Sequence, residues 1–144
     1  VIVDTQGPSA STTLSITAIN ADTGIGSDFI TSDNTLIFSG VLGAPLGAGE
    51  SVQLSLDGGS TWSAATVSGT SWTFDHSASV LADATYAVQA RVVDAAGNLG
   101  QTASQSVVVD TGAPSASITV SIIGISLDTG ASGSDFNTAD NTLL

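Results

Sequence analysis

Residues 81–93 read LADATYAVQARVV and contain the clearest strand pattern of the chain. Tyr86, Val88, Ala90 and Val92 occupy alternate positions, which is the period of a strand that turns one face toward a hydrophobic core. Tyr86 lies at the start of this strand, where the hydroxyl of a tyrosine can donate a hydrogen bond to a backbone carbonyl a few residues upstream. We predict this arrangement, a tyrosine corner, and the alternative is an ordinary half-buried tyrosine.

The same alternation continues on both sides of this stretch. The predicted strands cover residues 13–20, 35–41, 51–56, a segment beginning at 62, 71–75, 85–93 and 101–109. Within them, Leu14, Ile16 and Ala18 are predicted to lie on one face, Val52, Leu54 and Leu56 to point inward, and Trp72 and Phe74 to share a face. Tight turns separate several strands, at residues 57–60 (DGGS) and 68–70 (SGT). Seven strands without a helix predict an all-β fold, a seven-stranded immunoglobulin-like antiparallel β-sandwich.

The sequence also repeats itself after one domain length. VVVDT at residues 107–111 restates VIVDT at 1–5, and DNTL at 140–143 restates DNTL at 33–36. The offset is 106 between the prolines (114 − 8) and 107 between later aspartates (135 − 28). We therefore expect tandem repeats: residues 1–5 as the last strand of a preceding repeat, 6–110 as a complete immunoglobulin-like repeat, and 111–144 as the N-terminal third of the following one. The partial repeat would be completed by a longer chain or by a neighbouring chain.

The charge balance excludes two classes of partner. The chain has 13 acidic residues against one basic residue, Arg91, and a net charge of −12. Nucleic acids and anionic membrane surfaces both need clustered Lys and Arg, so we expect neither as a partner. We expect no membrane insertion, because no apolar run approaches the roughly 20 residues that cross a bilayer. The absence of cysteine excludes disulfides and thiolate metal sites.

Four segments together resemble one known family. They are residues 109–114 (VDTGAP), 22–34 (DTGIGSDFITSDN), 55–62 (SLDGGSTW) and 91–98 (RVVDAAGN). These segments are similar to the bacterial immunoglobulin-like tandem repeats of large biofilm or host-cell adhesins secreted by type I systems, including RTX adhesins. The resemblance implies an extracellular extender on the bacterial cell surface, whose partners are the adjacent repeats of the same polypeptide. It also implies calcium at or near the junctions between repeats, and it leaves the distal ligand unknown.

Strand direction predicts which acidic residues lie together. If successive strands alternate in direction, the loop at residues 22–33 lies at the end where the chain leaves at 110, and the loop at 94–98 lies where the chain arrives. Carboxylate and amide oxygens suit calcium, whereas zinc and copper favour nitrogen or sulfur ligands, which are nearly absent. The candidate calcium ligands are Asp22, Asp28, Asp33 and Asp110 at one end, and Asp94, Asn98 and Asp4 at the other.

Turn formation is the competing interpretation of each aspartate, because Asp and Asn side chains accept hydrogen bonds from nearby backbone N–H groups. We prefer turn formation for Asp57 and Asp75, and both interpretations stay open for Asp33 and Asp4. At the other positions calcium is favoured, because carboxylates that converge without a basic partner repel one another.

Catalysis and sugar binding are the rival functions. His76 lies between Asp75 and Ser77, but we expect these residues to end a strand rather than to form a Ser-His-Asp triad, and we predict that the protein is not an enzyme. Trp62 and Trp72 are predicted to be core residues rather than a sugar platform. A carbohydrate-binding β-sandwich module of a secreted protein and a subunit of an extracellular fibre remain the alternatives to a spacer.

Overall fold

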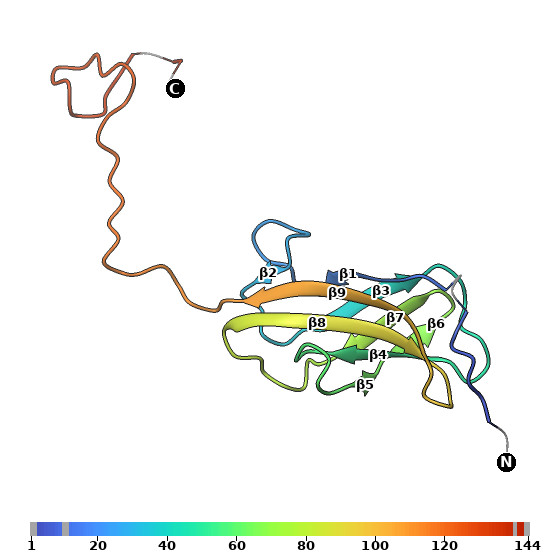
Figure 1. Cartoon of the computed structure of the whole chain (residues 1–144). Coiled ribbons are helices and arrows are strands. Elements are labelled where there is room, and N and C mark those ends of the chain that lie inside the picture. Colours follow the sequence, from blue (N-terminus) through green and yellow to red (C-terminus); the bar gives the residue numbers. More distant parts are fainter. Residues whose placement is uncertain (1–2, 10–11, 140, 143–144) are drawn as a thin grey trace. The chain divides into compact units, whose positions relative to one another are not determined.

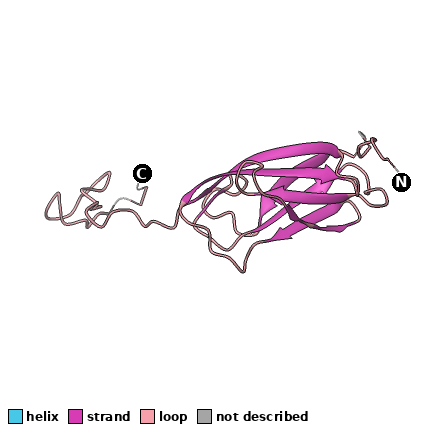
Figure 2. Cartoon of the chain, turned by 60° about the horizontal axis from the view of Figure 1, so that its bottom comes forward, coloured by secondary structure: helices cyan, strands magenta, loops and turns pink. Residues whose placement is uncertain are grey.

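Two β-sheets build the folded part of the chain. The computed structural model describes residues 3–9, 12–139 and 141–142. These residues contain strands and no helix (Figures 1 and 2), so the predicted all-β sandwich is confirmed. In chain order the strands are β1 Leu14–Ile19, β2 Ile30–Thr31, β3 Ile37–Leu42, β4 Ser51–Ser55, β5 Ser63–Ala64, β6 Thr66–Ser68, β7 Ser71–Asp75, β8 Ala84–Val93 and β9 Leu99–Val109.

The strands divide into a four-stranded sheet in the order β1-β3-β7-β6 and a five-stranded sheet in the order β2-β9-β8-β4-β5. Every pairing is antiparallel except that of β2, which runs parallel to β9 and pairs Ile30 with Val108 and Thr31 with Val109. β2 was not predicted, because two residues are too few to show a period of two.

The chain divides into two compact units, Val1–Gly112 and Ala113–Leu144, and the sandwich belongs to the first. The described residues of the second unit contain no strand, and several of its apolar side chains are exposed, among them Val120 at 92 % and Ile123 at 94 %. Residues 3–5 also lie outside any strand, and residues 1 and 2 fall outside the described part. The predicted division into residues 1–5, 6–110 and 111–144 therefore stays a prediction.

The core lies between the two sheets, where the alternation predicted it. Val88, Ala90 and Val92 of β8 are fully buried, and Tyr86 packs against the same core. Trp72 is 1 % exposed and lies across from Gly40 in the β3–β7 register. A Cβ atom at position 40 would lie 2.4 Å from Cζ2 of this indole, so the core requires glycine there.

A β-bulge changes the inward pattern of β1. The register of β1 against β3 shifts between Ile16 and Ala18, and such a bulge adds one residue that has no partner opposite it. As a result Ile19 is buried and Ala18 is exposed. The prediction that Ala18 shares one face with Leu14 and Ile16 is therefore wrong, because it assumed an uninterrupted alternation.

The predicted single strand that begins at residue 62 is also wrong, because the segment forms two strands that belong to different sheets. β5 pairs with β4 at the edge of the five-stranded sheet, and β6 pairs with β7 at the edge of the four-stranded sheet. Between them, the backbone N–H of Ala65 donates to the carbonyl of Val52. The crossing closes one side of the sandwich, and with β2 it accounts for nine strands in place of seven.

The predicted tyrosine corner is confirmed. The hydroxyl of Tyr86 donates a 2.9 Å hydrogen bond to the carbonyl of Ala82. Leu81, just before that carbonyl, is 8 % exposed and packs in the core. The bond therefore joins the start of β8 to a loop that Leu81 anchors in the core.

Candidate functional site

The loop between β1 and β3 folds around the carboxylate of Asp22. Oδ2 of Asp22 accepts hydrogen bonds from the backbone N–H of Ser27 at 2.7 Å and of Phe29 at 3.2 Å. Ser27 and Phe29 adopt left-handed backbone conformations, with φ of 76° and 61°. The turn directs the Phe29 side chain, 8 % exposed, into the core. The side chain of Asp22 thus fixes the shape of this loop.

Asp28 and Asp33 shape the next two turns of the same loop. Oδ1 of Asp28 accepts from the N–H of Ile30 at 2.9 Å. Oδ1 of Asp33 accepts from the N–H of Thr35 at 2.9 Å and from its hydroxyl at 2.7 Å, and Oδ2 accepts from Asn20 at 3.2 Å. These bonds lower the pKa of Asp33, with the backbone bond from Thr35 as the largest cause.

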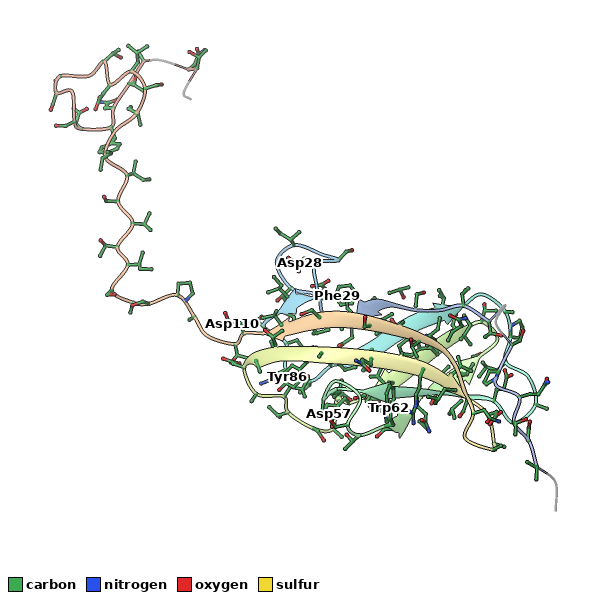
Figure 3. The ribbon with its side chains drawn as sticks, viewed as in Figure 1. Asp28, Phe29, Asp57, Trp62, Tyr86 and Asp110 are labelled. Atoms are coloured by element: carbon green, nitrogen blue, oxygen red, sulfur yellow. The ribbon has the colours of Figure 1, made fainter. Side chains whose placement is uncertain are left out.

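The structure places this loop beside the exit of β9, as strand direction predicted. The N–H of Asp110 donates to the carbonyl of Thr31 at 2.9 Å, and the N–H of Val108 donates to the carbonyl of Phe29 at 2.9 Å. Figure 3 shows Asp28, Phe29 and Asp110 at this end of the sandwich. The carboxylate of Asp110 accepts from the N–H of Gly112 at 2.9 Å.

Asp94 and Asn98 lie at the other end, beside the arriving chain, as predicted. Oδ1 of Asp94 accepts from the N–H groups of Ala96 and Asn98, both at 2.9 Å, and Oδ2 accepts from the Asn98 side chain at 2.9 Å. The side-chain bond from Asn98 is the largest cause of the lowered pKa of Asp94. The Asn98 amide also donates to the carbonyls of Asp4 at 3.3 Å and Gln6 at 3.1 Å, while the Asp4 carboxylate accepts from the N–H of Gln6 at 3.0 Å.

The predicted ligands are therefore brought to the same two ends, but each carboxylate is directed into a turn of its own. In residues 3–9, 12–139 and 141–142, no three His, Asp or Glu side chains lie close enough together to hold a metal. Calcium at these positions stays a prediction. Among these predicted ligands, Asp22 has a carboxylate oxygen, Oδ1, that is buried and has no hydrogen-bond partner in the described part of the chain.

The second unit builds the same loop again. Oδ2 of Asp128 accepts from the N–H of Phe136 at 3.1 Å, as Asp22 does from Phe29, and Phe136 has a φ of 59°. The hydroxyl of Thr129 accepts from the N–H of Ala139 at 3.0 Å. The equivalent bond in the first unit is the one from the N–H of Ser32 to the hydroxyl of Thr23, at 2.8 Å. Oδ1 of Asp128 is again buried without a partner. The sequence repeat is thus a repeat of hydrogen bonds as well.

The Asp75-His76-Ser77 segment ends a strand. The hydroxyl and the N–H of Ser77 donate to Oδ1 of Asp75 at 2.6 and 2.9 Å, and they lower the pKa of this carboxyl. The His76 ring stacks on Phe74, with centroids 6.1 Å apart. In a Ser-His-Asp triad the serine would donate to the histidine, whereas here it donates to the aspartate.

Trp62 contradicts its predicted place in the core, whereas the buried Trp72 agrees with it. Trp62 is half-buried on the outer face of the five-stranded sheet, and the guanidinium carbon of Arg91 lies 4.0 Å from its ring centroid. The indole N–H donates to the carbonyl of Gly59 at 2.9 Å, so the turn at residues 57–60 fixes the ring outside the sandwich. Arg91 alternates with the inward residues of β8 and therefore points outward. This outward position is the sequence signal for a side-chain cluster on the outer face of the sheet.

Comparison with known proteins bears on the first unit. Within the described residues no helix is long and apolar enough to cross a bilayer. No curated protein matches the chain. The sequence model described as "Bacterial Ig-like domain" matches residues 9–111, more than half of the 144 residues, and the chain belongs to this family.

Proposed function

We propose that this protein is an extender segment of a large bacterial cell-surface adhesin, stiffened by calcium at or near the junctions between its repeats, which projects a distal binding region outward. The observation that carries the proposal is the loop built twice, around Asp22 and around Asp128, with matching hydrogen bonds. A single binding or catalytic domain has no need of a second copy of its end loop. A tandem spacer has one at every repeat.

The path of the chain through the first unit suits a spacer. The loop at residues 94–98 bonds to the arriving chain at Asp4 and Gln6, and it leads directly into β9. β9 is 11 residues long, which is about 35 Å of extended strand, and it ends where the chain leaves at Asp110. The chain therefore arrives and leaves at opposite ends of this unit (Figure 1), so each added repeat adds length.

Unpaired carboxylate oxygens and the negative charge of the chain support the calcium part of the proposal. A buried carboxylate oxygen with no donor is costly to leave unpaired, and Asp22 and Asp128 both contain one. Calcium binds six to eight oxygens from carboxylates, carbonyls and water. Asp22, with Asp28, Asp33 and Asp110, would supply ligands at one end, and Asp94, Asn98 and Asp4 would do so at the other. A divalent ion there would also reduce the repulsion within a chain of net charge −12.

Calorimetric titration of the whole chain with calcium, and with magnesium as a competitor, tests this. We expect heat of calcium binding that is reduced in the Asp22→Asn variant. The matched control is Asp57→Asn, which removes the same charge from a turn whose aspartate is already fully bonded and should leave the binding unchanged. Absence of calcium binding, or equal loss in both variants, would remove calcium from the proposal.

A further inference from the structure

The outer face of the five-stranded sheet carries a surface that a spacer does not use. Two adjoining hollows of about 390 and 300 Å³ lie there, and both are lined by Gln89 of β8 and Ser104 of β9. These two residues are direct cross-strand partners. The hollows therefore form one path along β8 and β9, which we call the β8–β9 groove. Each volume is within the range of about 300–1,000 Å³ that is typical of small-molecule sites.

The only basic residue of the chain lies in this groove and is held rigidly. Arg91 is stacked on Trp62, and its Nε and Nη2 donate to Oε1 of Gln53 at 2.9 and 2.7 Å. Although the chain has 13 acidic residues, no ion pair to Arg91 is formed within the described part. A guanidinium has five N–H donors, so three remain after the two bonds to Gln53. The groove thus contains fixed donors that the protein itself does not use up.

The other groups that line the groove complete a hydrogen-bonding surface for hydroxyl groups. Gln89 supplies an amide donor and acceptor, and the hydroxyls of Thr102 and Ser104 can act in either sense. Leu99, 58 % exposed, and Trp62 supply apolar contact beside them. These groups suit a sugar ring. The planar amide and guanidinium groups, which alternate with hydroxyls, can bond to neighbouring hydroxyls of the ring, and the apolar surface beside them can pack against its C–H faces.

The ligand is expected to be neutral and extended. Gln53 already occupies the Nε and Nη2 edge of Arg91, which is one of the two guanidinium edges that can hold a carboxylate with two parallel bonds. The net charge of −12 also repels polyanions. Two hollows joined through Gln89 and Ser104 offer successive places for the units of a chain. We propose that the β8–β9 groove binds a neutral oligosaccharide.

Fluorescence titration of the whole chain with a panel of neutral hexasaccharides (cellohexaose, xylohexaose, mannohexaose and maltohexaose) tests this proposal. Trp72 is buried between the sheets, so a change in emission on binding reports on Trp62. We expect at least one neutral hexasaccharide to bind. The Gln89→Ala variant should weaken this binding by about ten-fold, the effect of losing one or two hydrogen bonds.

A matched pair of filling variants keeps the test independent of folding. Ser104→Tyr fills the shared part of the groove and should abolish binding. Thr73→Tyr places the same side chain at an exposed position of β7, in the other sheet, and should leave binding unchanged. Circular dichroism and thermal melting check that both variants fold. The proposal is overturned if no neutral hexasaccharide binds, if Ser104→Tyr still binds, or if oligogalacturonate binds more tightly than every neutral sugar.

Discussion

The hydroxyl of Ser55 donates a 2.7 Å hydrogen bond to Oδ1 of Asp57, and this contact ties the buried end of β4 to the turn that follows. Ser55 is 2 % exposed, and its oxygen also accepts from the N–H of Gly59 at 2.8 Å. Asp57 in turn accepts from the N–H groups of Ser60 and Thr61 and from the Thr61 hydroxyl. One carboxylate thus organises the turn that fixes Trp62, and turn formation, preferred for Asp57 from the sequence, is what the structure shows.

We expect Asp57 to make the stability of the sandwich depend on pH. The Ser55 hydroxyl and the bonds from Thr61 hold the pKa of Asp57 well below its ordinary value. A carboxyl whose folded pKa is lowered contributes stability above its unfolded pKa of about 4, and that contribution is lost as the pH falls toward the folded value. We expect the urea midpoint to fall between about pH 5 and pH 2, and to fall less in Asp57→Asn, which cannot be protonated there.

A second variant separates the bonds to Asp57 from its charge. Thr61→Val removes the 2.7 Å bond from the Thr61 hydroxyl to Oδ2 and leaves the carboxylate in place. Its pH dependence should lie between those of the wild type and Asp57→Asn. If all three proteins lose stability equally on acidification, the turn does not depend on the ionised carboxylate.

Tyr86→Phe tests the tyrosine corner. The substitution removes the donor of the 2.9 Å bond to Ala82 and keeps the ring against the core. We expect a loss of about 1–2 kcal/mol in the free energy of unfolding, the scale of one hydrogen bond with its acceptor left behind. Urea unfolding gives this value directly. An unchanged midpoint would mean that water replaces the hydroxyl at no cost.

Gly40→Ala tests the packing of the two sheets. The new Cβ would lie 1.9 Å from the carbonyl oxygen of Ser15 and 2.4 Å from the Trp72 ring. Neither the β1 backbone nor a fully buried indole can withdraw without repacking, and overpacking of this kind costs about 1–3 kcal/mol. The matched control is Gly69→Ser in the β6–β7 turn, where nothing lies within 4 Å and only the φ of 61° is strained. Thermal unfolding should shift further for Gly40→Ala, and an equal shift would contradict the close approach.

Periodicity predicted the long strands and most of the core because burial between two sheets imposes a period of two on any strand of five or more residues. It did not predict β2, and it merged β5 and β6 into one strand, because these strands are only two or three residues long. It also missed the bulge after Ile16, because an extra residue in β1 leaves no mark in composition.

The candidate site was predictable to the level of its loops and no further. Strand direction correctly placed the Asp22 loop beside Asp110 and placed Asn98 beside Asp4. The direction of each carboxylate is set by bonds from backbone N–H groups two to seven positions away, which sequence spacing does not specify. The sequence predicts Trp62 as a core residue rather than a sugar platform, whereas a local bond to Gly59 holds it outside.

The stiffness of the junction is the most consequential prediction, because a spacer projects its tip only if consecutive repeats keep one angle. The segment after Asp110 is short, and Pro114 restricts its own φ and the residue before it. Calcium at 100 times its dissociation constant would stabilise the state that binds it by about 2.7 kcal/mol, which is enough to select one arrangement.

We expect small-angle scattering of a protein with two complete repeats to show a longer, stiffer particle in calcium than in chelator. Asp110→Asn should abolish the difference and Asp57→Asn, equal in charge, should retain it; equal maximum dimensions with and without calcium would show that the ion does not set the junction.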